Sequence, residues 1–426
     1  MQYHISTELG DDENPGTSEK PWKTLARANA HHYENDDKLL LRAGETFPGF
    51  LRLSPDNVTK SDSERFIVQA YNLFIGSDES TPRPIIEAGT ESGITIRNLS
   101  RIRILDIDVR GSGHDTNTGW GVCILNDAPG AERLDYVTVS GVRASGFRWA
   151  GIYVGGIPND LPGFDTPADC RHGFSNVTIN KCEAFGNMYY GIYVSGRLSP
   201  DMTDYANTNV EIDKCKAYDN PGDKFYTENH SGSGILLDNC QTGLILNCEA
   251  WNNGAENGGL NGGPCGIWAH CGDRIVVQYC RSHGNRTGGS HDGTGFDLDG
   301  GVTNSIIEHC ESWDNDGPGF LVWNYENAPF TLSGNIFRDC TSTNDGRKHN
   351  YGGIHIGTSG EPVTDMWVRD CQVTQTVAPD GNRPPCLWIG AKVQNAVLRG
   401  NTLVADHDAP GVVIESGAEN IVQDNQ

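Results

Sequence analysis

Residues 177–195 read VTINKCEAFGNMYYGIYVS, and much of the chain repeats the pattern of this stretch. Its first part alternates apolar and polar residues up to a cysteine, and its second part is a glycine followed by another alternating run. Alternation with a period of two is typical of β-strands, and Asn and Gly between the runs are typical of a turn. The stretch therefore predicts two short strands joined by a tight turn.

Both halves of this unit recur along the chain. The glycine-led half occurs ten times, 24 to 43 residues apart: GVCIL at 121, GIYVG at 151, GIYVS at 191, GILLD at 234, GIWAH at 266, GFDLD at 295, GFLVW at 319, GIHIG at 353, CLWIG at 386 and GVVIE at 411. The cysteine-bearing half occurs seven times, with its cysteines 30 to 33 residues apart at positions 182, 215, 248, 280, 310, 340 and 371. Such a repeat is typical of a solenoid whose coils stack as parallel strands ~4.8 Å apart. The sequence predicts an all-β fold of about ten coils.

Composition and charge exclude several classes of partner. Lys and Arg number 32 against 56 Asp and Glu, and the resulting net charge of −24 repels nucleic acid and anionic membrane surfaces. No run of about 18 apolar residues is present that would span a membrane. We therefore expect neither nucleic acid nor membrane as a partner. The first residues, MQYHISTELG, carry no signal segment, and we expect a secreted or periplasmic protein whose signal has been removed.

Equivalent residues of stacked coils form columns, and the cysteines form one of them. We interpret this column as core packing, because coils ~4.8 Å apart hold Cβ atoms farther apart than the ~3.8 Å of a disulfide. Cys265 and Cys271 lack the spacing of a zinc site, so the cysteines predict no metal site. An asparagine follows most column cysteines by five residues: Asn187, Asn220, Asn253, Asn285 and Asn315. Stacked side-chain amides can link neighbouring coils.

These features resemble the right-handed parallel β-helix of the pectate-lyase-like superfamily. The N-terminal stretch YHISTELGDDENPGTSEKPWKTLARANA, followed by DKLLLRAGETF, is similar to the opening of bacterial β-helix proteins that act on polysaccharides. The resemblance implies one domain over 1–426, with an N-terminal cap and first coil at 1–50 and stacked coils with loop insertions at 51–426. Residues 22–30 would form a short capping helix. The superfamily includes hydrolases, lyases, epimerases and phage tailspikes, so the resemblance implies a polysaccharide partner.

The segment GTGFDLDGG at 293–301 holds two aspartates in a predicted strand. Alternation places Phe296 and Leu298 inside the coil and turns Asp297 and Asp299 out to solvent. The Cα atoms of these aspartates should lie ~6.6 Å apart, with His270 one rung and Asp238 two rungs from Asp299.

Aromatic residues share this outward face, which carries no lysine. We expect five of them to bind sugar rings: Tyr193, Trp268, Trp323, His355 and Trp388. Long inserted segments at 156–175, 196–209, 219–233 and 253–264 favour a groove with loop walls. The alternative is that loops fold over this face and bury the rings as a satellite core.

The arrangement favours a glycoside hydrolase. Asp238, Asp297 and Asp299 are the predicted catalytic carboxyls, and His270 is expected to tune them, because crowded carboxylates raise the pKa of one member. The spacing fits an inverting mechanism better than a retaining one. Polygalacturonase-like β-helix hydrolases are similar in placing three aspartates on neighbouring coils, although their sequence motifs are absent here.

A polysaccharide lyase is the chief alternative. The segment RKHNYGG supplies candidate substrate-binding or basic groups beside His270 and His355, namely Arg347, Lys348, His349 and Tyr351. No cofactor is firmly predicted, and calcium is the candidate ion, held by a set of aspartates: Asp292, Asp297, Asp299, Asp314 and Asp316. The simpler interpretations are a turn for WDNDGPGF and a solvated charge pair for Arg347 and Lys348. A third alternative is a non-catalytic glycan binder or adhesin.

Overall fold

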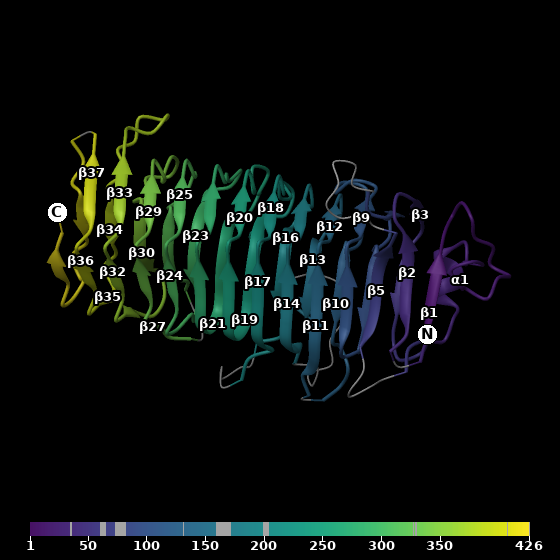
Figure 1. Ribbon diagram of the computed structural model, residues 1–426. Coiled ribbons are helices and arrows are strands. Elements are labelled where there is room, and N and C mark those ends of the chain that lie inside the picture. Colours follow the sequence, from purple (N-terminus) through teal and green to yellow (C-terminus); the bar gives the residue numbers. More distant parts are fainter. Residues whose placement is uncertain are drawn as a thin grey trace.

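The computed structural model describes residues 1–425 except 35, 60–64, 73–81, 131, 159–171, 199–203, 327, 329 and 407. The described chain winds into a stack of coils with the two termini at opposite ends (Figure 1). The strands pair in parallel from one coil to the next, as the sequence predicted. They form three columns that run along the stack.

The first column carries the glycine-led segments. Its strands are β4 (Leu51–Leu53), β7 (Ile94–Arg97), β10 (Val122–Leu125), β13 (Ala150–Gly155), β16 (Tyr190–Ser195), β19 (Ser233–Leu246), β21 (Cys265–Gln278), β23 (Thr294–Asp299), β26 (Phe320–Asn324), β30 (Ile354–Thr358), β34 (Leu387–Ile389) and β38 (Val412–Ile414).

The second column follows the first around each coil, and the long strands β19 and β21 contribute to both. Its other strands are β1 (Gln2–Ile5), β2 (Lys38–Arg42), β5 (Phe66–Tyr71), β8 (Ile102–Leu105), β11 (Leu134–Ser140), β14 (Phe174–Asn180), β17 (Asn207–Asp213), β24 (Ile306–Glu308), β28 (Ile336–Arg338), β32 (Trp367–Arg369), β36 (Val397–Arg399) and β39 (Val422–Asp424). A small sheet holds β27 (Leu332–Ser333), β31 (Val363–Thr364) and β35 (Val393–Gln394).

The third column forms a separate sheet along the upper side of Figure 1. Its strands are β3 (Thr46–Pro48), β6 (Ile85–Gly89), β9 (Asp108–Gly111), β12 (Arg143–Ser145), β15 (Glu183–Phe185), β18 (Lys216–Tyr218), β20 (Glu249–Trp251), β22 (Arg281–His283), β25 (Glu311–Trp313), β29 (Thr341–Thr343), β33 (Gln372–Gln375) and β37 (Thr402–Ala405). These twelve strands correspond to twelve coils in the described part of the chain, against the prediction of about ten. The two additional coils carry β4, which follows Phe50 and lacks the glycine-led pattern, and β7, whose GITIR at 93 fits the pattern but was not counted.

Sharp corners separate the columns. The residue before a column cysteine takes the left-handed region, as at Lys181 and Lys214, both with φ of 52°. One residue in this conformation reverses the chain direction enough to start the next strand. This geometry explains why the cysteine motif recurs with so constant a spacing.

The interior is apolar along its whole length. Alternate residues of the first column point inward, so Phe296 and Leu298 of β23 are fully buried. The predicted cysteine column is confirmed as core packing: its cysteines are buried and free, and their thiols contact backbone carbonyls, as Cys215 does with Ile179.

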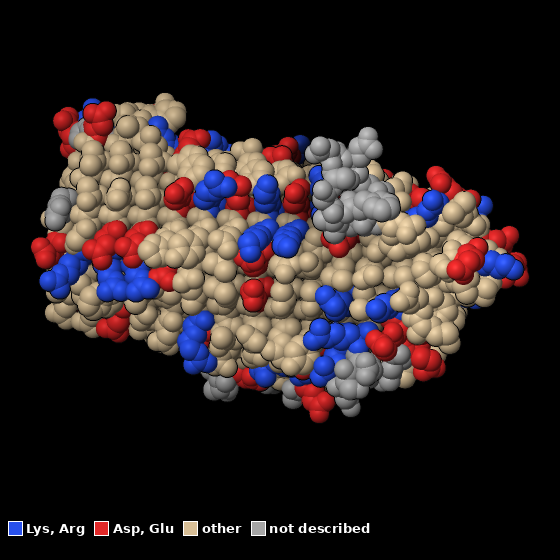
Figure 2. All heavy atoms as spheres, in the orientation of Figure 1, with Lys and Arg blue, Asp and Glu red and all other residues tan. Residues whose placement is uncertain are grey.

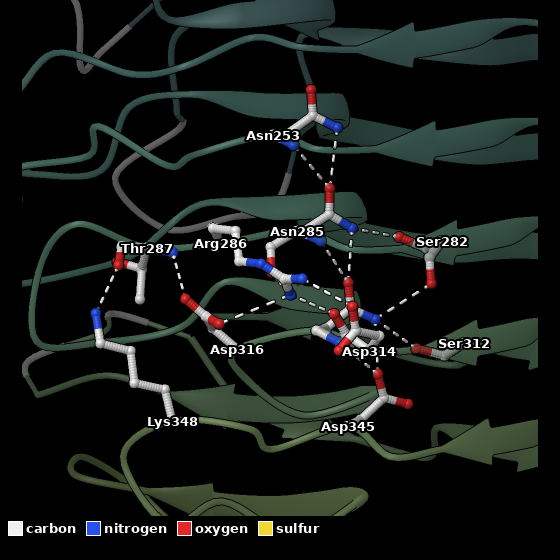
Figure 3. Close-up of polar contacts among 11 residues, drawn as sticks. Asn253, Ser282, Asn285, Arg286, Thr287, Ser312, Asp314, Asp316, Asp345 and Lys348 are labelled. Atoms are coloured by element: carbon white, nitrogen blue, oxygen red, sulfur yellow. Dashed lines mark hydrogen bonds and ion pairs between the residues drawn. The ribbon is translucent and has the colours of Figure 1, made fainter. Parts of the chain in front are cut away.

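The predicted asparagine column is also confirmed (Figure 3). Asn253 Nδ2 donates to Asn285 Oδ1 at 3.0 Å, and Asn285 Nδ2 donates to Asn315 Oδ1 at 2.9 Å. Asn315 Nδ2 then donates to Asp345 Oδ1 at 2.7 Å, so the column ends in a carboxyl. Each bond joins one coil to the next and satisfies buried polar groups.

The N-terminal end of the stack is covered by the predicted cap. Its helix, α1 (Leu25–Asn29), is shorter than the expected 22–30 and begins at Thr24, whose side-chain oxygen accepts the Arg27 N–H. Trp22 and Leu25 are buried against the first coil. In the described part of the chain, none of the helices has the length and apolarity needed to cross a membrane.

Candidate active site

The first column brings the predicted catalytic residues together on its outer face. Asp238 of β19 pairs in register with His270 of β21, and His270 pairs with Asp299 of β23. Trp268 pairs with Asp297 in the same way. The predicted order, with His270 one rung and Asp238 two rungs from Asp299, is confirmed.

The aspartates turn away from the core but are less exposed than expected. Asp297 is only 3% exposed and Asp238 is also buried, whereas Asp299 and His270 are partly exposed. The prediction that both Asp297 and Asp299 face solvent is therefore wrong for Asp297. Strand alternation fixes which side a residue faces, but the neighbouring side chains decide whether water reaches it.

Two predicted sugar-binding rings are buried as well. Tyr193 is 0% and Trp268 is 4% exposed, and both lie in a second apolar cluster on the outer face of the early coils. His230, from the inserted segment 219–233, packs edge-on against Trp268 at 4.9 Å between ring centroids. The satellite core that we weighed as an alternative is thus what the structure shows for these two rings.

A chain of hydrogen bonds links residues of four coils at this face. Ser195 Oγ donates to Asp238 Oδ2 at 2.5 Å, and Asp238 Oδ1 lies 2.9 Å from His270 Nδ1. The other ring nitrogen, His270 Nε2, lies 3.3 Å from the hydroxyl of Tyr325. The Asp238 carboxylate fixes the imidazole orientation and leaves Nε2 facing outward to Tyr325.

The pKa of His270 is raised by this environment. Burial by itself lowers the pKa, but the neighbouring Cys271 sulfur and the hydrogen bond to Asp238 outweigh it. Burial raises the pKa of Cys271 to about 11, so its thiol is uncharged at neutral pH. The Asp238 carboxylate is therefore the group that keeps a proton on His270.

Tyr325 reaches His270 because of a glycine. A Cβ atom on Gly300, directly after Asp299, would lie 2.2 Å from Tyr325 Cε1. Such a distance is far inside van der Waals contact, so any larger residue at 300 would displace the ring. Tyr325 was not predicted, although the glycine at the end of GFDLDG is the signal of this close approach.

The two strand-β23 carboxyls sit in different environments. Burial, then the neighbouring charges of Asp299 and Asp292, raise the pKa of Asp297 well above its usual range. Cys265 Sγ lies 3.7 Å from Asp297 Oδ2, and Asp297 Oδ1 has no hydrogen-bond partner among the described residues. Burial also raises the pKa of Asp299, but His270 and the Gly300 N–H, 2.8 Å from its Oδ1, act against this rise.

Asp292 completes a group of three carboxyls. Burial and the charge of Asp299 raise its pKa to about 7, while a hydrogen bond from the Gly263 N–H opposes the rise. Three crowded carboxyls cannot all ionise at neutral pH, so this group retains protons there.

Asp238, His270 and Cys271 are close enough to suggest a metal site, with candidate ligand atoms within 4.8 Å of one another. His270, however, directs Nδ1 to Asp238 and Nε2 towards the Cys271 sulfur at 3.3 Å, so one ion cannot use both bonds. The Cys271 thiol also donates to the Gly300 carbonyl at 3.1 Å, whereas a metal requires the thiolate. We interpret the cluster as a hydrogen-bonded chain.

Three of the predicted rings flank the carboxyls on the later coils. Trp323 is partly exposed on β26, and Trp388 is partly exposed on β34. His355, largely buried, stacks against Trp388 at 5.5 Å and 19°. The Trp388 indole N–H donates to Glu415 Oε1 at 3.1 Å, which holds the ring. Trp323, His355 and Trp388 thus keep the outward positions that the sequence predicted.

Arg347 and Lys348, two predicted substrate-binding residues, are bonded to backbone carbonyls. Arg347 donates to the Thr376 carbonyl at 3.1 Å and the Val377 carbonyl at 2.9 Å, at the corner beside the third column. Lys348 Nζ donates to the Thr287 carbonyl at 2.7 Å (Figure 3). Both cations join coils, and no contact in the described part of the chain places either beside the carboxyls, so their contact with substrate stays a prediction.

The predicted calcium-binding set is also divided. Asp314 and Asp316 pair with Arg286 at that corner, at 2.7 and 3.7 Å (Figure 3). Asp292, Asp297 and Asp299 lie together at the first column, as the charge coupling among them shows. A single site made from all five carboxylates does not form.

Comparison with known proteins identifies the fold. Residues 120–337 match the sequence model of the family described as right handed beta helix region. Among solved structures, the chain is similar to the GH136 lacto-N-biosidase from Eubacterium ramulus, with a TM-score of 0.64, 15% identity, and coverage of 100% of this chain and 67% of that one. It is also similar to the Dettilon tailspike protein, with a TM-score of 0.54, 13% identity, and coverage of 89% and 62%. No curated protein matches the chain in sequence. At these identities the likeness shows the fold alone.

Proposed function

We propose that this chain, which belongs to the right-handed β-helix family, is a glycoside hydrolase acting at the first-column site around Asp297 and Asp299. The observation that carries the proposal is the pair of carboxyls on one strand face in unequal environments. One is buried with a strongly raised pKa, and the other is partly exposed beside a protonated histidine. Glycoside hydrolysis requires such a pair, one carboxyl to donate a proton and one to act as base or nucleophile.

Asp297 has the features of the general acid. Its raised pKa keeps a proton on the carboxyl near neutral pH, and that proton can pass to the oxygen of the leaving sugar. Asp299 has those of the carboxylate, because it is partly exposed and the Gly300 N–H stabilises its charge. It would activate water or attack the sugar carbon.

His270 acts on this pair as a positioning residue. Its imidazolium, held by Asp238 and touching the Tyr325 hydroxyl, favours ionisation of Asp299. The partly exposed rings of Trp323 and Trp388 supply platforms for sugar rings on the later coils. A solved hydrolase of similar fold supports the proposal only in showing that this scaffold is compatible with glycan cleavage.

A polysaccharide lyase is the second candidate, and the contact of His270 with Tyr325 favours it. A tyrosine or histidine can remove a proton next to a uronic carboxylate. The bonds of Arg347 and Lys348 to backbone carbonyls weaken this candidate, since elimination also needs a cation to neutralise the carboxylate. A glycan-binding protein without enzymatic activity is the third candidate.

An extracellular glycan is the natural target under all three candidate functions, so we propose a secreted or periplasmic location.

The deciding experiment is incubation with a panel of polysaccharides and oligosaccharides, with reducing ends and absorbance near 235 nm both recorded. New reducing ends without absorbance indicate hydrolysis, and new ends with absorbance indicate elimination. If neither signal appears with any substrate, the proposal that the protein is an enzyme is contradicted. Asp297→Asn and Asp299→Asn should each lower kcat by about 10²-fold or more. Asp56→Asn is the matched control, because Asp56 is exposed directly after β4 near the N-terminal end of the stack and should leave the rate unchanged. Normal turnover by both site variants, with unchanged circular dichroism, would refute the assignment.

A further inference from the structure

The outer face of the third column carries a ladder of stacked rings. One ring from each of five successive coils lies in register: Phe185, Tyr218, Trp251, His283 and Trp313. Adjacent rings are nearly parallel, with interplanar angles of 3° to 7° and centroid separations between 4.1 and 6.0 Å. All five are half-buried, so the ladder runs along the surface.

A column of charges of alternating sign runs beside the rings. It consists of Arg143, Glu183, Lys216, Glu249, Arg281 and Glu311, in register on the same strands. Arg281 pairs with Glu249 at 3.2 Å, and Arg143 pairs with Glu183 at 3.2 Å. Figure 2 shows acidic and basic side chains alternating over this upper part of the stack. The ring ladder and the charge column together cover the outer face of the third column.

Both columns stop at the same coil. On β29, Thr341 takes the register position after Glu311, and Thr343 takes the position after Trp313. Threonine is too short to cover an indole, so the face of Trp313 that points away from His283 lacks a stacking ring within the described residues. A hollow of about 450 Å³ lies at this step and is lined by Trp313, Thr343, Asn344 and Arg347 among others. This volume falls in the range of pockets that hold small ligands.

The lining is rich in polar groups around one aromatic face. Arg347 is fixed by its bonds to the carbonyls of Thr376 and Val377, so its guanidinium forms a rigid wall. Asn344 lines the hollow, and because its Oδ1 accepts from Thr376, its amide N–H groups are the atoms left to donate to a ligand. The threonine hydroxyls and the Glu311 carboxylate supply acceptors. One flat apolar face edged by donors and acceptors matches a pyranose ring, which has C–H patches on its faces and hydroxyls around its rim.

We propose that this hollow is a second glycan-binding site, in which a pyranose unit of a neutral glycan stacks on Trp313 and continues the ring ladder by one step. The sugar would occupy the place that an aromatic side chain fills on each preceding coil. The net charge of −24 disfavours an anionic ligand, and the exposed Glu311 at the edge adds to this. The site lies on a different column from Asp297 and Asp299, so it does not depend on the activity proposed for them.

Direct binding tests this site. Cellohexaose, xylohexaose, maltohexaose and β-1,4-galactohexaose are titrated into the full chain by calorimetry, and into Asp299→Asn wherever the wild type cleaves the probe. At least one probe should bind. Trp313→Ala should weaken that binding about tenfold or more, because it removes the stacking face. Trp251→Ala is the matched control: Trp251 belongs to the same ladder, but Tyr218 and His283 cover both of its faces at 4.2 and 6.0 Å.

A second variant adds a ring instead of removing one. Thr343→Trp should extend the ladder, fill the hollow and abolish binding while Trp313 stays in place. No binding of any probe at about 10 mM would overturn the inference. It would also be overturned if binding survived both Trp313→Ala and Thr343→Trp but disappeared in Trp323→Ala, because the glycan would then lie on the first column. In that outcome the proposed hydrolase function would still stand.

Discussion

At the scale of single residues, the proposed chemistry depends on how far each carboxyl of β23 is removed from water. Asp297 and Asp299 are two residues apart and face the same side, yet one is buried and the other is partly exposed. Their alternation with Leu298 was readable from the sequence because period two is local. Their unequal burial depends on side chains from other coils, such as Cys265 and Tyr325, which no local pattern identifies.

Gly300 offers a test of how His270 is held. Gly300→Ala would place a Cβ 2.2 Å from Tyr325 Cε1 and should push the Tyr325 hydroxyl away from His270 Nε2. We expect kcat to fall about tenfold, the loss typical of one misplaced polar group in an active site, and Tyr325→Phe should act in the same direction. Gly411→Ala is the matched control, since its Cβ would meet only Leu403 at 3.8 Å. Wild-type rates in both site variants would show that Tyr325 has no part in the reaction.

The same residue scale shows why sugar platforms were over-predicted. Trp268 and Trp323 looked alike in the sequence, since both occupy outward positions of glycine-led strands. The inserted segment before β19 brings His230 onto Trp268 and buries it, whereas Trp323 remains partly exposed. Where an inserted loop folds back is a tertiary property, and the sequence could only pose the two alternatives.

At the scale of elements, the asparagine column shows how side chains register one coil on the next. From Asn187 to Asn315 every rung repeats the same amide pair, so the sequence sufficed to predict it. Asp345 interrupts the series: its Oδ1 accepts from Asn315 and its Oδ2 accepts from Ser342 at 2.7 Å. On the next coil, the buried Gln375 has no hydrogen-bond partner for either side-chain polar atom among the described residues. An amide at 345 could still accept from Asn315 through its oxygen and would bury no charge.

Asp345→Asn should therefore stabilise the stack, and more at high pH. Burial raises the pKa of Asp345 to about 7, while the unfolded carboxyl titrates near 3.8. Below the unfolded value both states are protonated and the shift has no effect. Between the two values only the unfolded state loses its proton, so stability falls as pH rises. On going from pH 5 to pH 8, the buried carboxyl therefore lowers the free energy of unfolding by about 2 to 3 kcal/mol, and the amide avoids this loss.

Thermal melts of the wild type and Asp345→Asn at pH 5 and pH 8 would measure this difference. The variant should gain more in Tm at pH 8 than at pH 5. Asn315→Asp, on the preceding rung, is the matched control and should lower Tm most at pH 8, because it adds a second buried carboxyl. An equal change at both pH values would mean that the Asp345 carboxyl does not titrate between them.

At the scale of the whole molecule, the repeat made the fold predictable and the first coils made the count inexact. Ten glycine-led segments indicated ten coils, whereas the described chain has twelve: the coil of β4 lacks the glycine, and the GITIR segment of β7 was not counted. The ring ladder of the third column was visible as EAF, KAY, EAW, RSH and ESW after or at each cysteine motif, yet it drew no prediction. The ladder indicates a binding site only where it stops, at the step between β25 and β29, because one face of the last ring is left uncovered there.

The net charge of the molecule predicts which glycans it can approach. A chain of net charge −24 repels polyanions at long range. Salt weakens this repulsion, because the Debye length falls from about 10 Å at 0.1 M to about 3 Å at 1 M. With a neutral glycan, kcat/KM should change less than about twofold between these salt concentrations, because no charge is screened. With a polyuronate, any rate should rise severalfold. Measuring both substrates across the salt series separates a hydrolase of neutral glycans from a uronate lyase. A polyuronate cleaved fastest at low salt would contradict the charge argument, because it would require a local cationic or metal-lined groove strong enough to reverse the field of the whole chain.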